Sequence, residues 1–106
     1  MIPEGGNIRD VPSGIRSKKR TLVRANRHDI SNTIVTLPDD LLHYAEDRIL
    51  TVRETARIQS YDDTYVFLGK RTSCNTARRT ELPQYSQVGN SVPPIFARAL
   101  GQHLLR

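Results

Sequence analysis

The side chains that could perform chemistry are few, and their types and spacing do not form an active site. The sequence holds one cysteine, Cys74, within a polar stretch. One cysteine cannot build a disulfide framework, and such sparse use is typical of a reducing cytosol. The three histidines, His28, His43 and His103, are far apart, and no second cysteine accompanies them. We therefore predict no metal site, and we interpret Cys74 as an incidental loop residue.

The basic residues are segregated along the chain, which favours a polyanionic partner. Sixteen Lys and Arg against eleven Asp and Glu give a net charge of +5. Residues 11–28 contain no acidic side chain, and their basic ones are Arg16, Lys18, Lys19, Arg20, Arg24 and Arg27. Segregated cations suit a polyanion because its counterions are released on binding. On composition alone, a solvated basic surface explains the pattern equally well.

The size and composition of the chain limit its architecture. It has 106 residues, of which 37% are hydrophobic, so it has room for one small domain with a lean core. No apolar run approaches the roughly 20 residues of a membrane helix, and the N-terminus lacks a signal-peptide layout. We expect a cytoplasmic protein with no membrane partner. Its fold should be α/β (α+β), with two helices, one or two short strands and much irregular chain.

The strongest local signal predicts a helix that begins after Thr51. Thr51 can accept hydrogen bonds from the first free amides, and Glu54 stands three residues on, as a capping box requires. The helix should continue through Gln59 and end near residues 60–62. Val52, Ala56 and Gln59 form a thin apolar face along it.

The segments that flank this helix predict a strand and an aromatic cluster. Residues 33–36 are β-branched throughout and stop before Pro38, which predicts one short strand. Residues 61–68 are the most aromatic part of the chain, with Tyr61, Tyr65 and Phe67. We expect these rings to pack onto the helix end, with base stacking as the alternative. A polar, basic loop should follow at residues 69–83.

A second helix is predicted near the C-terminus. Pro93 and Pro94 fit only its first turn, where their missing amides are not needed. Gly89 permits a backbone conformation that other residues avoid, and Asn90 or Ser91 can cap the helix. The residues that recur at helical spacing are Ile95, Phe96, Ala99, Leu100, His103 and Leu104. Little in this chain could cover that stripe, so we expect the isolated chain to self-associate.

Two motifs coincide with these helical segments. Residues 48–61 read RILTVRETARIQSY, and residues 87–94 read QVGNSVPP. Taken in order and at this separation, they resemble the ninth and tenth signatures of the DNA (cytosine-5)-methyltransferases. Residues 2–7, with Pro12 beyond, also resemble a segment in the target-recognition region of some bacterial members.

The resemblance implies a division of the chain into two parts. Residues 1–47 would be a partial target-recognition region, basic and largely irregular, with a short strand near 33–36. Residues 48–106 would be a C-terminal helical segment that carries both signatures. Together they would form the C-terminal piece of a Rossmann-like methyltransferase. We interpret Arg53, Glu54 and Arg57 as structural residues of the ninth signature.

The activity that the resemblance implies needs residues that this sequence does not contain. In the family, a cysteine thiolate attacks carbon-6 of a flipped-out cytosine, a glutamate assists, and S-adenosylmethionine supplies the methyl group. The sequence lacks a glycine-rich cofactor loop, a Pro-Cys turn and a Glu-Asn-Val motif. We therefore predict no catalytic residue in this chain, and we expect it to be inactive without a catalytic half or subunit.

The resemblance also implies two sets of contacts. Asn90, Ser91 and Val92 match the turn that lies against the methionine end of S-adenosylmethionine, which would bind only with the catalytic half present. A capped helix start there would offer free amides to the cofactor carboxylate. A plain turn before a helix explains the same residues.

Duplex DNA is the second implied partner. Thr33 matches a threonine that touches a DNA phosphate, and Arg24 precedes it at the spacing of a family arginine, for which a phosphate contact is the more plausible role. Lys19 and Arg20 complete the predicted DNA contacts. A different class of function also fits: a stand-alone basic DNA-binding module or a degenerate relic, whose binding would be salt-sensitive and independent of cofactor.

Overall fold

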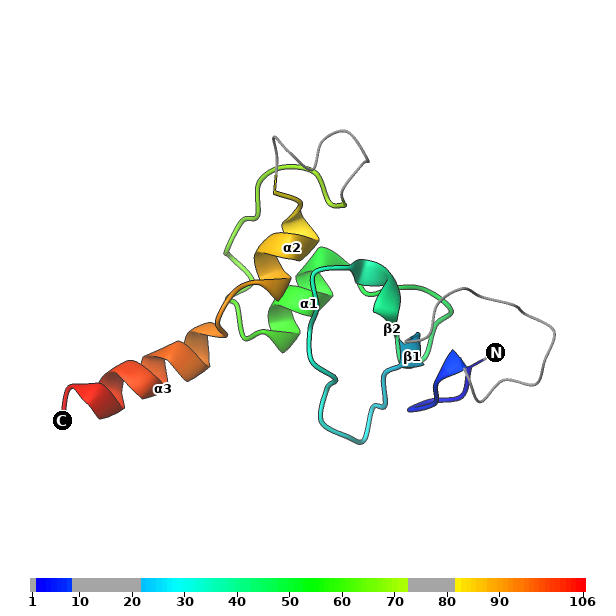
Figure 1. Cartoon of the computed structure of the whole chain (residues 1–106), viewed down its shortest axis with the longest axis horizontal. Helices are drawn as coiled ribbons and strands as arrows, with labels where there is room; N and C mark the ends of the chain where they lie inside the picture. The colour runs from blue at the N-terminus through cyan, green and yellow to red at the C-terminus, as the bar shows by residue number, and fades with distance from the viewer. Residues whose placement is uncertain (1, 9–21, 73–81) are drawn as a thin grey trace. The chain divides into compact units, whose positions relative to one another are not determined.

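The computed structural model describes residues 2–8, 22–72 and 82–106. Its elements are β1 (Val23–Arg24), a 3₁₀ turn (Pro38–Asp40), β2 (Leu41–Leu42), α1 (Val52–Ile58), α2 (Gln84–Gly89) and α3 (Pro94–Leu104), as Figure 1 shows. The chain divides into two compact units, the first made of Met1–Thr33 and Pro38–Leu50, the second of Ile34–Leu37 and Thr51–Arg106. The predicted small mixed fold is confirmed at this level.

The first unit is organised by a short parallel sheet. Val23 pairs with Leu41 and Arg24 with Leu42. Antiparallel bridges add Asn7 beside Val23 and Ile49 beside Leu42. Leu41 is buried between these segments. Residues from the start of the chain, its middle and the stretch before α1 are thereby brought into one unit.

The predicted strand at residues 33–36 is wrong. Among the described residues, strands occur only at residues 23–24 and 41–42. The β-branched side chains favour extended chain, but no neighbouring strand offers residues 33–36 a ladder. Instead, Val35 lies against α2 in the second unit, where its carbonyl group would be 2.7 Å from a Cβ built on Gly89.

The helix predicted after Thr51 is confirmed together with its cap. The Glu54 amide donates to Thr51 Oγ1 at 3.2 Å, and the Thr51 amide donates to the Glu54 carboxylate at 2.7 Å. Both halves of the capping box are therefore present. Val52, Thr55 and Ala56 are buried along the face that faces the core.

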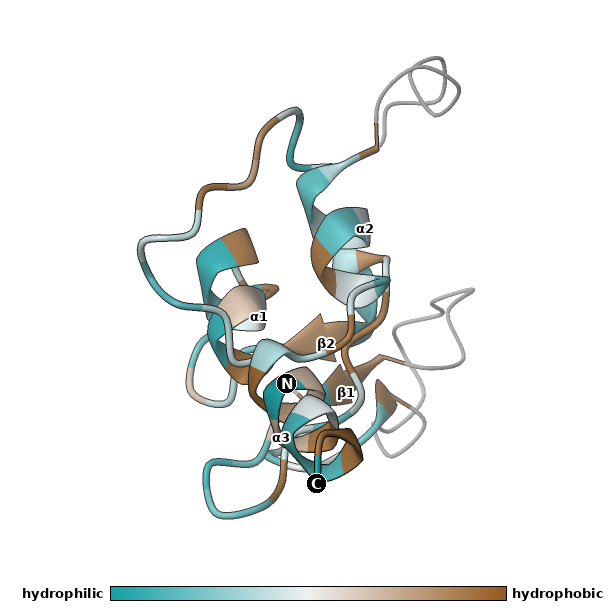
Figure 2. Ribbon diagram, turned by 90° about the vertical axis from the view of Figure 1, so that its left-hand side faces the viewer, coloured by the Kyte–Doolittle hydropathy of each residue, from teal (hydrophilic) through white to brown (hydrophobic). Residues whose placement is uncertain are grey.

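The second unit packs α1 against α2 around a small core, which consists of Val52, Ala56, Phe67, Tyr85 and Val88. Figure 2 shows hydrophobic stretches on both of these helices. Beside the core, Tyr61 lies with its ring centroid 5.0 Å from those of Tyr65 and Phe67. The prediction that these rings pack onto the helix is confirmed for Phe67, which lies in the core, and for Tyr61, which packs against it, whereas Tyr65 is 52% exposed.

The short helix α2 was not expected. It has only six residues, and Pro83 before it provides no side-chain cap. The sequence therefore contains neither the length nor the capping residue by which a helix is predicted. Gly89 is its last residue, and its φ is not positive. The expectation that Gly89 supplies a special turn is therefore wrong. A glycine is required because the Val35 backbone passes too close to leave room for a Cβ atom.

The C-terminal helix α3 begins at Pro94, as predicted, but its cap differs from the prediction. The residue before it is Pro93, and no side chain from Asn90 or Ser91 caps it. No residue of α3 is buried. Ile95, Phe96 and Leu104 are 68%, 60% and 73% exposed. The apolar stripe is thus uncovered within the described part of the chain.

Candidate functional site

The segment between α2 and α3, residues 90–93, carries the predicted cofactor residues, and we call it the α2–α3 link. Its backbone is tied to the end of α2: the Asn90 amide donates to the Ser86 carbonyl at 3.0 Å, and the Ser91 amide donates to the Val88 carbonyl at 3.2 Å. The Ser91 hydroxyl also donates to the Val88 carbonyl, at 2.7 Å. The side chains of Asn90 and Val92 are exposed.

Two residues that follow α1 also form hydrogen bonds with this link and with the start of α3. The Gln59 carboxamide donates to the carbonyl oxygens of Val88 and Ser91, at 3.2 and 3.4 Å. Ser60 Oγ accepts a hydrogen bond from the Ile95 amide at 3.1 Å, in the first turn of α3. The two motif segments, which are far apart in the sequence, are therefore directly bonded to each other.

The start of α3 has fewer free amides to offer a carboxylate than the sequence suggests. Pro93 and Pro94 have no N–H group, and the Ile95 amide already donates to Ser60. What the link does present is the exposed Asn90 carboxamide, which can both donate and accept, and the apolar Val92 side chain. This combination fits a small ligand with one polar and one apolar group. The cofactor roles of Asn90, Ser91 and Val92 stay predictions.

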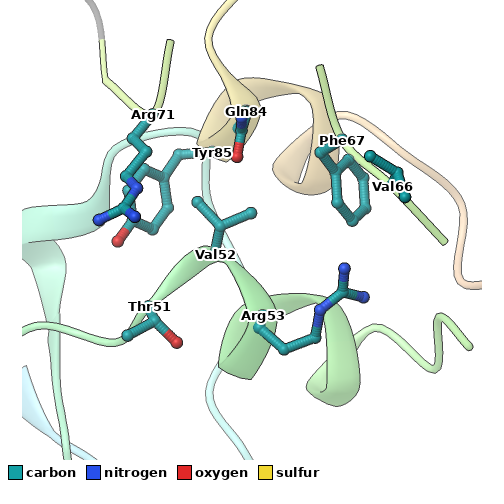
Figure 3. Close-up of a pocket in the computed structure, with 8 residues that line it drawn as sticks. All are labelled: Thr51, Val52, Arg53, Val66, Phe67, Arg71, Gln84 and Tyr85. Carbon is teal, nitrogen blue, oxygen red and sulfur yellow. The ribbon is translucent and has the colours of Figure 1, made fainter. Parts of the chain in front are cut away.

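A pocket of about 300 Å³ lies at the start of α1 in the second unit (Figure 3), and eight residues line it: Thr51, Val52, Arg53, Val66, Phe67, Arg71, Gln84 and Tyr85. Its two arginines stand on opposite sides, Arg53 by Phe67 and Arg71 by Tyr85. The Arg53 guanidinium donates to the carbonyl oxygens of Asp62 and Tyr65 at 3.3 and 2.5 Å. Arg53 therefore anchors the chain that follows α1.

The other charged residues of the ninth signature also have contacts within the unit. Arg57 donates two hydrogen bonds to the Asp63 carboxylate, at 2.8 and 3.0 Å. This pairing lowers the pKa of Asp63, and it raises the pKa of Arg57. Both side chains are largely exposed, so the ion pair contributes little stability. Glu54 completes the cap of α1, and all three residues act structurally inside this chain.

Of the predicted DNA contacts, Arg24 has the most surprising environment. Its side chain is 5% exposed and pairs with Asp47. It also donates to the carbonyl oxygens of Ile2 at 2.6 Å and of His43 and Glu46 at 2.8 Å. Four of its five N–H groups are thus occupied. In this structure Arg24 fastens the first unit together, and its predicted phosphate contact is not tested.

The remaining predicted residues have simpler placements. Thr33 is exposed and is the last residue of the first segment of the first unit. Lys19, Arg20 and Cys74 lie outside the described residues. Within the described ranges, no group of three His, Cys, Asp or Glu side chains is placed to hold a metal ion. In the same ranges, no helix has the length and apolar character needed to cross a membrane.

The sequence analysis did not anticipate the roles of Gln59 and Ser60. Gln59 was expected to lie on the apolar face of α1, and Ser60 to mark the end of that helix. One signal was available for Ser60: a serine stands directly after the helix, where glycine is usual. The partner of its hydroxyl, 35 residues away, could not be read from the sequence.

Comparison with known proteins identifies the family of this chain. Residues 6–106 match the C-5 cytosine-specific DNA methylases. Because the match spans nearly the whole chain, this chain belongs to that family.

Individual relatives are type II methyltransferases. The chain is 33% identical to M1.HphI of Haemophilus parahaemolyticus over 109 residues, 100% of this chain but 27% of that protein. It is 46% identical to M.DdeI of Desulfomicrobium norvegicum over 65 residues, 61% of this chain and 15% of the relative. M.AquIB of a Picosynechococcus strain is 42% identical over 64 residues, 59% of this chain and 46% of that protein.

These relatives differ in length from the chain. It spans about a quarter of M1.HphI, whereas a similar number of matched residues fills a much larger share of M.AquIB than of M.DdeI. M.AquIB is therefore a far shorter protein than M.DdeI. No solved structure matches this chain significantly.

Proposed function

We propose that this chain is the C-terminal DNA-recognition and cofactor-side part of a cytosine-5 DNA methyltransferase of the restriction–modification type. With a catalytic half outside the printed sequence, it would support methyl transfer from S-adenosylmethionine to cytosine in duplex DNA in the bacterial cytosol. Alone it would be inactive. The single observation that carries this proposal is the bonding of the ninth-signature helix to the tenth-signature link, beside an α3 without a buried residue.

The exposed stripe of α3 supports the need for a catalytic half. Phe96 and Leu100 are 60% and 48% exposed, although a stripe of this kind is normally covered. M1.HphI has more than twice as many residues outside the region that this chain matches as inside it, since that region is 27% of the protein. We assign the cover of α3 to that missing region. The short length of M.AquIB supports a separate subunit as the form in which such a part can exist.

In this proposal, S-adenosylmethionine supplies the methyl group, and this chain binds and orients its amino-acid end. Asn90 would hydrogen-bond to the cofactor through its exposed carboxamide, while Val92 would contact its apolar part. Ser91 would act through its position, since its hydroxyl already donates to Val88. Thr33, with Lys19 and Arg20, would contact DNA phosphates, which orient the duplex without reading its sequence.

The decisive experiment is complementation. The purified chain is mixed with a catalytic half, made by deleting from M1.HphI the region that this chain matches, and transfer of labelled methyl groups to duplex DNA is measured. Activity is expected only in the mixture. A Phe96→Asp variant should abolish it, because a charge on the stripe opposes docking of α3. If no cognate catalytic half gains activity from the wild-type chain, the chain is a relic or a separate DNA-binding module.

A further inference from the structure

We infer that Gln59 and Ser60 are positioning residues for the cofactor segment, so that the end of α1 sets the conformation of the α2–α3 link. This inference rests on the proposed cofactor role of Asn90 and Val92. In this inference, two residues near the end of the ninth signature fix the backbone of the tenth-signature segment. Neither residue needs to touch the cofactor for this task.

Ser60 has a backbone conformation that is unusual for serine. Ser60 has φ of 66°, in the left-handed region that favours glycine. Around it, the Ser60 amide donates to the Arg57 carbonyl at 3.0 Å, and the Tyr61 amide donates to the Ala56 carbonyl at 2.9 Å. This is the hydrogen-bond pattern of a Schellman motif, whose left-handed position is usually glycine. A serine here carries a conformational cost that glycine would avoid.

The hydroxyl of Ser60 explains why serine stands there. Ser60 Oγ accepts a hydrogen bond from the Ile95 amide. This amide lies in the first turn of α3, where amides have no partner inside the helix. Pro93, in the N-cap position, supplies no side-chain hydrogen bond. Ser60 therefore caps α3 from 35 residues away. Glycine would relieve the strain at the end of α1 but leave α3 without this cap.

Gln59 holds the other end of the link. Its carboxamide nitrogen has two N–H groups, and these reach the carbonyl oxygens of Val88 and Ser91. Val88 is fully buried in the core of the second unit. Gln59 therefore connects a buried residue of α2 with Ser91, the second residue of the link. Together with Ser60, it restrains the segment on both sides of Val92.

The consequence is a preorganised ligand segment. Asn90 and Val92 remain exposed while the backbone that carries them is held by internal hydrogen bonds. Rigid presentation lowers the entropy lost on binding. Loosening the link should therefore weaken cofactor binding, whereas the DNA contacts proposed for the first part of the chain should be unaffected.

The test uses the whole chain with the variants Ser60→Ala, Ser60→Gly and Gln59→Met, and amide hydrogen exchange as the first readout. Both Ser60 variants should speed exchange of the Ile95 amide about five-fold, the size expected for loss of a helix cap. Gln59→Met should speed exchange of the Ser91 amide. The matched control is Gln84→Met, which removes a hydrogen bond to the Gly69 carbonyl and should change neither amide.

The second readout is the reconstituted enzyme. With the catalytic half present, the Ser60 and Gln59 variants should raise KM for S-adenosylmethionine about five-fold and leave KM for DNA unchanged. Unchanged Ile95 exchange in both Ser60 variants would overturn the inference. Altered exchange with an unchanged cofactor KM would overturn it too, by separating the link from the cofactor. If the wild-type chain restores no activity, the proposed function fails, while exchange still decides whether Ser60 and Gln59 hold the link.

Discussion

Arg24 shows how a single basic residue can serve the fold while its sequence context points to DNA. Its guanidinium joins Ile2, at the start of the chain, to His43, Glu46 and Asp47 in the stretch before α1. The fork geometry of arginine makes this possible, since it directs several N–H groups into one plane. A lysine keeps the charge but cannot reach four acceptors at once.

We expect Arg24→Lys to destabilise the first unit by about 2 kcal/mol, because buried carbonyl groups lose their partners. Amide hydrogen exchange at Ala25, which bonds to Leu42, measures this. The control is Arg27→Ala, since Arg27 is half-exposed and pairs with the exposed Glu4, a contact that contributes little stability. If Arg24→Lys leaves exchange at Ala25 unchanged and weakens only DNA binding, Arg24 serves as a phosphate contact instead.

At the scale of elements, close packing decides where the extended chain at Val35 and the helix α2 meet. Val35 passes so near Gly89 that a Cβ there would be 2.7 Å from its carbonyl carbon and oxygen. No flexible side chain can move aside, because the contact is backbone to backbone. In contrast, Gly101 in α3 has nothing within 4 Å of its potential Cβ.

The two glycines therefore form a matched pair of substitutions. Gly89→Ala should destabilise the second unit by about 1–3 kcal/mol through overpacking. Gly101→Ala should stabilise α3 by about 0.5–1 kcal/mol, since alanine is the better helix former. Urea unfolding followed by circular dichroism measures both. Equal effects of the two substitutions would show that the contact with Val35 does not constrain the helix.

For the whole molecule, the uncovered apolar stripe of α3 is the dominant feature. Ile95, Phe96 and Leu100 are exposed on α3. An amphipathic helix of this kind normally packs its apolar face against another part of the protein. Water-exposed apolar area of this kind is buried by association when no partner is present.

The isolated chain should therefore self-associate with increasing concentration, and Leu100→Asp should return it to a monomer. Light scattering over a range of concentrations measures the mass directly. Adding the catalytic half should also dissolve the assemblies, because it competes for the same stripe. A monomer at high concentration would contradict this expectation and show that α3 does not need a cover.

The sequence alone was enough to predict the features that depend on near neighbours along the chain. The capping box at Thr51 and Glu54 links residues three apart, and the start of α3 follows from the fixed φ of Pro94. The motif order was enough to indicate the family, which the match over residues 6–106 confirms.

Only the tertiary structure decided the features whose partners are distant. Residues 33–36 have the composition of a strand, yet among the described residues they pair with none, and position 89 requires glycine because the Val35 backbone passes it. Ser60 caps a helix at Ile95, 35 residues further along the sequence. The buried Arg24 donates hydrogen bonds to carbonyl groups that lie about 20 residues before and after it. A local pattern specifies which conformations a segment can adopt, but the hydrogen-bond partner that selects one of them is supplied by the fold.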